Sequence, residues 1–141
     1  MFDTILLPLD PKEPDEVAAA FGIRTAERFD SDLLILSVID RPQQRDQIRA
    51  DFEESVRGNL DMVLADASDR GVHVEIDIRE GEAHEEIIQV AETGADLIVM
   101  GTAAREGLDR IVLGSVAESV VQGSPVPVMM VPPVVRRPTD V

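Results

Sequence analysis

Asp96-Leu97-Ile98-Val99-Met100-Gly101 holds four apolar residues in an unbroken row. Such a row is typical of a strand that is buried on both faces of a parallel sheet. The segment that follows, residues 101–115, carries three glycines and leads into a helical pattern. We therefore expect residues 97–100 to form a central strand whose carboxyl end opens into a glycine-rich loop.

Helix and strand patterns alternate on both sides of this strand. The expected strands are residues 5–9, 32–38, 72–79, 97–100 and 126–131. The helical patterns between them cover residues 14–29, 43–70, 84–93 and 115–122. Strict alternation of this kind arises from parallel strands joined by right-handed crossover helices. The sequence therefore predicts an α/β fold: an open five-stranded parallel sheet with helices on both faces.

The character of each strand predicts its place in the sheet. Residues 5–9 and 97–100 are continuously apolar, so we expect both at the centre. Residues 72–79 alternate between apolar and polar, and Pro127 within 126–131 cannot donate a hydrogen bond, so we expect these two strands at the edges. The predicted Rossmann-like order is 3-2-1-4-5. Ligands of such sheets bind beyond the carboxyl ends of the strands, where the chain direction reverses, here between strands 1 and 4.

Composition narrows the class of protein. The 141 residues are 44 % hydrophobic, which suits one domain with a real core. Because there is no cysteine, disulfides and thiolate chemistry are excluded. The net charge of −15 repels nucleic acid, so we expect neither DNA nor RNA as a partner. No apolar run approaches the roughly 20 residues that span a bilayer, and no signal peptide is visible, so we expect a cytoplasmic protein without membrane contact.

The glycine-rich segment 101–115 is the best candidate for binding chemistry. Gly114 and Ser115 are expected to open the last helix, where free N–H groups and the helix dipole favour an anion such as phosphate. Glycines also serve ordinary strand-to-helix turns, so the residues alone leave both interpretations open. Neither G-x-x-x-x-G-K-[ST] nor G-x-G-x-x-G occurs where it would be needed, which argues against a P-loop NTPase and the usual dinucleotide fold.

Several motifs together resemble the universal stress protein family, over about residues 2–132. They are Leu7-Pro8-Leu9-Asp10, Ser37-Val38-Ile39-Asp40, Asp96-Leu97-Ile98-Val99-Met100-Gly101, the run from Gly107-Leu108-Asp109-Arg110 to Leu113-Gly114-Ser115-Val116-Ala117-Glu118, and Ser124-Pro125-Val126-Pro127-Val128-Met129-Met130-Val131. The resemblance implies an adenine nucleotide alpha hydrolase-like domain over residues 1–133. It also implies a stress-response role, as a sensor or adaptor governed by a nucleotide. Residues 134–141 show no pattern and are expected to form a loose tail.

Family members that bind ATP share a pattern of glycine, two residues, glycine, nine residues, glycine, then serine or threonine. Gly101, Gly114 and Ser115 fall in register with it, whereas Ala104 stands at the second glycine position. By this resemblance Gly101, Ala104, Gly114, Ser115 and Val116 would hold the phosphates and ribose of ATP, or of AMP or ADP. A Cβ at position 104 would cost about 1 kcal/mol if the backbone there needs positive φ.

The same resemblance assigns the adenine and ribose end to residues at other strand ends. These are Pro8, Leu9, Asp10, Val38 and Met100. Asp10 suits a ribose hydroxyl, or a Mg²⁺ ion held by the phosphates, and its plain interpretation is a loop residue before Pro11. Arg105 is placed to meet a phosphate, or is simply a solvated loop arginine.

Two functions remain open at this stage. One is a nucleotide-binding sensor or adaptor; the other is a dimeric interaction module of the same family that binds no nucleotide. The hydrophobic edge strand 126–131 predicts a homodimer in either case, because an uncovered apolar edge pairs with a second copy. Protein partners beyond that copy are unknown. No general base is visible and the loop has no lysine, so we do not expect an enzyme. We expect His73 and His84 to be solvated.

The acidic excess predicts adaptation to a salt-rich, halophilic cytoplasm. At 1 M salt the Debye length falls to about 3 Å, so repulsion between the 28 acidic residues is largely screened. We expect the thermal midpoint to rise from low to molar salt when unfolding is followed by circular dichroism. A thermal midpoint that does not rise with salt would indicate an acidic protein that is not adapted to high salt.

Overall fold

The structure, a computed structural model, describes residues 2–39, 46–102 and 113–133. The strands in these ranges are β1 (Thr4–Pro8), β2 (Asp32–Ile39), β3 (Val74–Glu80), β4 (Leu97–Gly101) and β5 (Val128–Val131). The helices are α1 (Glu16–Phe29), α2 (Asp46–Asn59), α3 (Asp61–Asp69), α4 (Ala83–Gly94) and α5 (Ser115–Gly123). The strands pair in parallel in the order β3-β2-β1-β4-β5, which confirms the predicted fold class and strand order.

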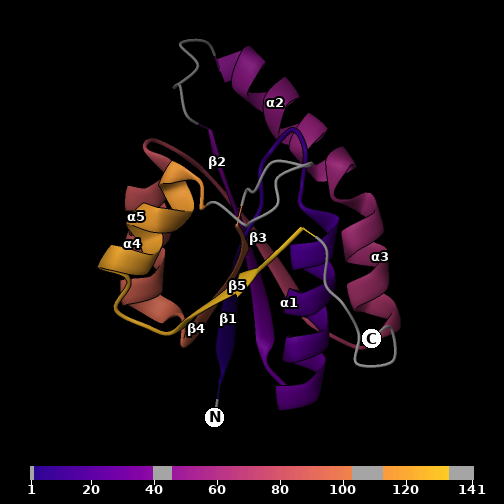
Figure 1. The fold of residues 1–141 in the computed structure, drawn as a ribbon. Coiled ribbons are helices and arrows are strands. Elements are labelled where there is room, and N and C mark those ends of the chain that lie inside the picture. Colours follow the sequence, from indigo (N-terminus) through magenta and orange to yellow (C-terminus); the bar gives the residue numbers. More distant parts are fainter. Residues whose placement is uncertain (1, 40–45, 103–112, 134–141) are drawn as a thin grey trace.

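Helices cover both faces of this sheet (Figure 1). Because successive side chains of a strand point to opposite faces, β1 supplies both sides of the core. Ile5 and Leu7 belong to a cluster with α1 and α3, whereas Leu6 belongs to a second cluster with α4 and α5. All three side chains are fully buried. None of the helices in the described ranges is long and apolar enough to cross a membrane.

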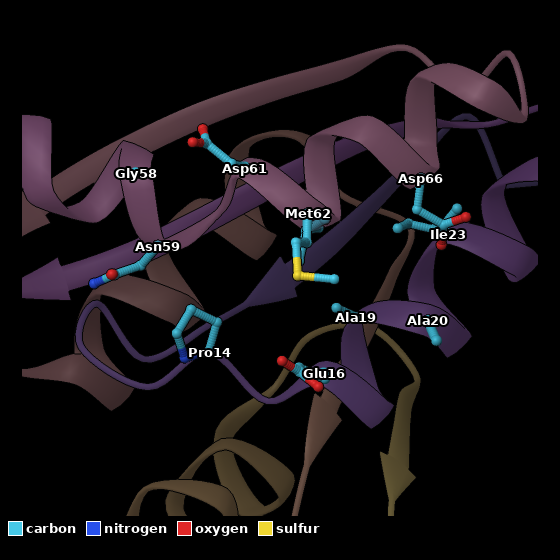
Figure 2. A pocket seen from close by; sticks show the side chains of 11 residues that line it. Pro14, Glu16, Ala19, Ala20, Ile23, Gly58, Asn59, Asp61, Met62 and Asp66 are labelled. Carbon is cyan, nitrogen blue, oxygen red and sulfur yellow. The ribbon is translucent and has the colours of Figure 1, made fainter.

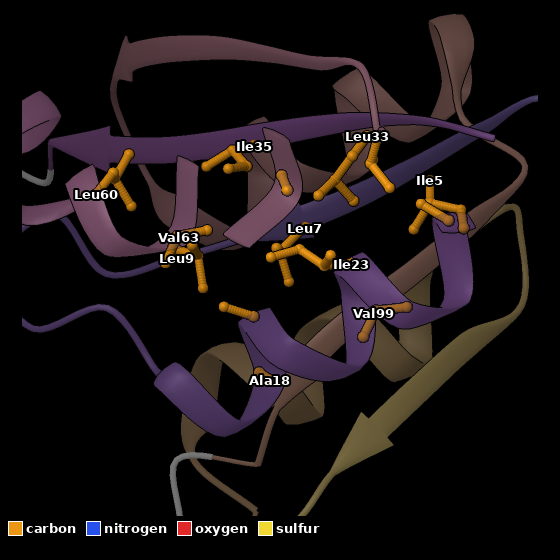
Figure 3. Close-up of a cluster of buried hydrophobic side chains, with 14 of the residues drawn as sticks. Ile5, Leu7, Leu9, Ala18, Ile23, Leu33, Ile35, Leu60, Val63 and Val99 are labelled. Carbon is orange, nitrogen blue, oxygen red and sulfur yellow. The ribbon is translucent and has the colours of Figure 1, made fainter. Parts of the chain in front are cut away.

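The cluster beneath α1 and α3 is the larger one (Figure 3). Ile23 of α1, Leu60 before α3 and Ile35 of β2 are each at most 1 % exposed. Burying a side chain of this size contributes about 1.5–3 kcal/mol relative to leaving it in water. This cluster therefore fixes α1 and α3 against the sheet, and with them the loop between β1 and α1.

The long helix expected over residues 43–70 is instead two helices, α2 and α3, and residues 43–45 lie outside the described ranges. They meet at Leu60, which has φ −98° and ψ 1°. Asn59 Nδ2 donates to the carbonyl oxygen of Pro11 at 3.0 Å, and Leu60 is fully buried. The tie to the β1–α1 loop and the poor helix propensity of Gly58 and Asn59 explain the break.

Other element boundaries shift by at most two residues, and two of these shifts have a visible cause. The first helix begins at Glu16 rather than Pro14, because the Asp15 side chain caps it by accepting from Ala18 N at 3.0 Å. The last strand begins at Val128 rather than at Val126. Ser124 Oγ accepts from Val126 N at 3.1 Å and donates to the carbonyl oxygen of the same residue, so this stretch is a turn.

A carboxylate joins the start of β1 to the start of β4. Asp96 Oδ2 accepts from Asp3 N at 2.9 Å and from Thr4 N at 3.0 Å. Asp96 N donates in turn to the carbonyl oxygen of Thr4 at 2.9 Å. These bonds hold the two central strands together at the end opposite to their carboxyl ends.

We expect Asp96→Ala to lower the free energy of unfolding by about 1–2 kcal/mol, because two backbone donors lose a charged acceptor. Asp96→Asn keeps one acceptor oxygen and should cost less. Urea denaturation measures both, with Asp32→Ala as the control, because the exposed Asp32 side chain makes no hydrogen bond within the described residues. Equal effects of Asp96→Ala and Asp32→Ala would contradict the role given to Asp96.

Candidate functional site

A cavity of about 670 Å³ opens where β1 and β4 end. The chain leaves β1 for α1 on one face of the sheet and leaves β4 for α5 on the other, so a gap remains between the two exits. Many of the predicted site residues line this cavity, and they come from β1 and its loop, β2, β4 and α5. They are Pro8, Leu9, Asp10, Val38, Met100, Gly101 and Val116.

The remaining predicted residues lie beside the cavity or outside the described ranges. Gly114 and Ser115 directly precede Val116 at the start of α5, but they are not part of the lining. Ala104 and Arg105 lie outside the described residues. The binding roles of all these residues therefore stay predictions.

Sequence reasoning missed part of the cavity wall. Glu13 and Asp15 add two carboxylates from the β1–α1 loop, Ala83 and Ile87 come from the first turns of α4, and Pro133 follows β5. The helical pattern after β3 was a signal for α4, since every crossover helix of a parallel sheet starts at the carboxyl edge. Nothing in the sequence placed Pro133 beside the β1–α1 loop.

The N-terminus of α5 is fixed next to the end of β4. Gly114 N donates to the carbonyl oxygen of Thr102 at 3.0 Å, and Thr102 N donates to that of Val131 at 3.2 Å. Gly114 occupies the N-cap position, and no side chain caps this helix within the described residues. The first N–H groups of a helix have no acceptor within it, so this end is chemically suited to an anion.

Asp10 is held at the rim by its own turn. Its Oδ1 accepts from Lys12 N at 2.8 Å and from Glu13 N at 3.0 Å, and the residue is exposed. Its Oδ2 accepts no hydrogen bond within the described structure. The two interpretations of Asp10 are thus compatible, because one oxygen shapes the loop and the other is available to a ligand.

Gly101 is a point of close approach between β4 and α1. Asp15 uses Oδ1 to cap α1, and its Oδ2 lies so close to Gly101 that a Cβ there would overlap it and stand 3.1 Å from Cγ. The φ of Gly101 lies outside the left-handed region. Glycine is therefore required here for space and not for backbone conformation.

The described residues provide no ready-made metal site. No group of three His, Cys, Asp or Glu side chains among them is arranged to hold a metal ion. His73 is exposed, as expected for a solvated histidine, and its Nε2 lies 3.7 Å from Oε1 of Glu75. His84 is half-buried at the start of α4, so it is less solvated than expected, and it does not line the cavity.

Known proteins match this chain over almost its whole length. The family model described as universal stress protein family matches residues 1–132. The chain belongs to the universal stress protein family. Universal stress protein MJ0531 of Methanocaldococcus jannaschii is 34 % identical, over 93 % of this chain and 82 % of that protein. Universal stress protein Sll1654 of Synechocystis is 35 % identical, over 94 % of this chain and 87 % of that protein.

Solved structures of universal stress proteins share the fold. The structure of MJ0577 superposes with a TM-score of 0.71 at 28 % identity, over 97 % of this chain and 98 % of that one. A universal stress protein in complex with cAMP gives 0.67 at 26 % identity, over 92 % and 97 %. The protein of Archaeoglobus fulgidus in complex with dAMP gives 0.70 at 17 % identity, over 91 % and 96 %, a likeness in fold alone.

The contact between Gly101 and Asp15 predicts coupled effects on stability. Gly101→Ala should displace the Asp15 carboxylate and so lose the cap of α1, which is worth about 1 kcal/mol. In an Asp15→Ala background that cap is already gone. In urea denaturation, the double variant should therefore lose about 1 kcal/mol less unfolding free energy than the sum of the losses of the two single variants.

Gly94→Ala is the matched control for this cycle, because a Cβ at Gly94 meets nothing within 4 Å. It should be neutral or stabilising in both backgrounds. Strictly additive losses for Gly101→Ala and Asp15→Ala would show that the two residues do not constrain each other.

Proposed function

We propose that this universal stress protein binds an adenine nucleotide in the cavity between the ends of β1 and β4. The observation that carries the proposal is the convergence of four separate segments on one space. Residues 8–10, Val38, Met100–Gly101 and Val116 were singled out from sequence motifs, and they line the same cavity of about 670 Å³. The cAMP complex of a relative at 26 % identity supports the same class of ligand.

The apolar part of the cavity wall fits a nucleobase. Pro8, Leu9 and Val38 line it with Met100 and Ile87, and these side chains offer apolar surface and no charge. A flat, weakly polar ring is bound by apolar walls of this kind, with a few polar groups fixing its orientation. Asp10, with its free Oδ2, is placed to accept from a ribose hydroxyl.

The phosphates of the nucleotide fit only near the start of α5. Glu13, Asp15 and Asp10 make the loop side acidic, and no Lys, Arg or His is among the lining residues that the structure describes. Phosphates therefore belong at the start of α5, next to Gly114 and Ser115, where backbone N–H groups point outward. A Mg²⁺ ion between phosphate and Asp10 would lower the repulsion, with phosphate oxygens as its other ligands.

We further propose a sensor or adaptor role in the cytoplasm, with ATP, ADP or AMP held rather than turned over. The homodimer through residues 126–131 belongs to the same proposal. Within the described residues β5 is the last strand of the sheet and pairs with β4 only, and Met129 is 38 % exposed on it. An open apolar edge of this kind favours pairing with a second copy.

Calorimetric titration with ATP, ADP and AMP, each with and without Mg²⁺, tests the nucleotide site. We expect saturable heat from at least one of them, and Gly114→Leu should weaken binding about tenfold or more because it crowds the start of α5. Gly94→Leu is the matched control. It places the same side chain at the far end of α4, in open space, and should bind as the parent chain does.

Light scattering on the same samples separates the two candidate functions. A dimer that gives no heat with any of these nucleotides at millimolar concentration would overturn the nucleotide site and favour the non-binding interaction module. A monomer at micromolar concentration would remove the edge-strand dimer and leave nucleotide binding to stand alone.

A further inference from the structure

A second hollow, of about 420 Å³, lies between α1 and the α2–α3 junction. We call it the α1–α3 groove. Its floor is apolar: Ala19, Ile23 and Val63 line it and are buried. Met62 is 80 % exposed, and Figure 2 shows its side chain projecting from α3 toward Ala19 of α1. Because the floor residues are already buried, Met62 is the main apolar surface that a further apolar group could cover here.

The rim of the groove is acidic. Glu16 stands at the start of α1, and Asp61 and Asp66 stand on α3. Asp66 already pairs with Arg70, whose Nε is 3.0 Å from Oδ1, and this contact helps to raise the pKa of Arg70 above its usual value. Glu16 and Asp61 have no basic partner within the described residues. The groove therefore suits a segment that carries apolar side chains and unpaired positive charge.

The chain itself contains such a segment directly after the last described residue, Pro133. Val134-Val135-Arg136-Arg137 follows directly on Pro133, with two apolar side chains and then two arginines. Pro133 lines the nucleotide cavity together with Pro14, and Pro14 also lines the α1–α3 groove. The tail thus leaves the described chain from the wall of a cavity that shares Pro14 with the groove.

We propose that residues 134–137 dock in the α1–α3 groove of their own chain. The valines cover the exposed side chain of Met62, and the two arginines face Glu16 and Asp61. Exposed ion pairs are individually weak, so the docked and free tails exchange. Removing both acidic partners shifts the ratio of docked to free tail by about two- to tenfold. This arrangement does not depend on whether the neighbouring cavity holds a nucleotide.

A spin label on the tail measures docking directly. The parent chain has no cysteine, so Thr139→Cys provides a single attachment point for a nitroxide. We expect the label to reduce the intensity of amide NMR signals from residues 16–23 and 58–66 more than from α4 and α5. The experiment uses the full chain at a salt concentration at which its spectrum is that of a folded protein.

Paired variants then test the chemistry. Arg136→Gln with Arg137→Gln should restore the lost groove signals, and so should Glu16→Gln with Asp61→Asn. Glu92→Gln with Glu118→Gln is the matched control, because it removes two exposed carboxylates from the helices on the opposite face of the sheet. Added salt should also restore the signals, since the pairs are open to solvent.

Three results would overturn the proposal. One is signal loss spread evenly over the surface, and another is signal loss that the control variant relieves as much as the rim variant does. The third comes from mixing isotope-labelled chains with unlabelled spin-labelled chains. Loss at the groove in that mixture would assign the groove to the tail of a second copy instead.

Discussion

Parallel pairing on both sides of β1 is the constraint on which the rest of this molecule depends. From Thr4 to Pro8 the strand pairs with β2, and at Ile5 and Leu6 it also pairs with β4. Because β1 and β4 are neighbours and the helices that follow them, α1 and α5, lie on opposite faces of the sheet, neither helix fills the space beyond the ends of the two strands. The cavity is therefore a consequence of strand order, and the side chains around it only determine what it admits.

That order was predictable because burial leaves a pattern in the sequence. The apolar rows of residues 5–9 and 97–100 identify strands covered on both faces, and the alternation at 72–79 identifies an edge. The location of the cavity between strands 1 and 4 followed from the same reasoning, whereas the residues expected to line it came from the family resemblance. Family motifs then added a ligand class, which periodicity alone does not provide.

The features that escaped prediction are those made by contacts between distant parts of the chain. The spacing of Val56, Leu60 and Val63 is the same whether one helix continues or two helices meet, so periodicity cannot reveal the break. The break depends on Asn59 reaching the backbone of Pro11 across 48 positions in sequence. Asp15 likewise looks like an ordinary acidic residue at a helix start until the end of β4 is placed beside it.

The acidity of the surface also has a local meaning. The cavity between the ends of β1 and β4 and the α1–α3 groove both carry carboxylates on their rims, and Pro14 forms part of both walls. Each hollow thus repels anions where these carboxylates stand. The start of α5 differs, because there backbone N–H groups favour an anion.

The contact of Asp15 with Gly101 sets a limit on how this cavity can diversify. One oxygen of Asp15 keeps α1 folded while the other occupies the space that a side chain at position 101 would need. A substitution at position 101 therefore destabilises the fold, whatever its effect on the binding of a ligand. Asp10 has a similar double role, because its Oδ1 shapes the loop, whereas Val38 on the rim takes no part in such a turn or cap. Lineages that descend from this chain would alter ligand preference at the rim first, and would keep the floor unchanged.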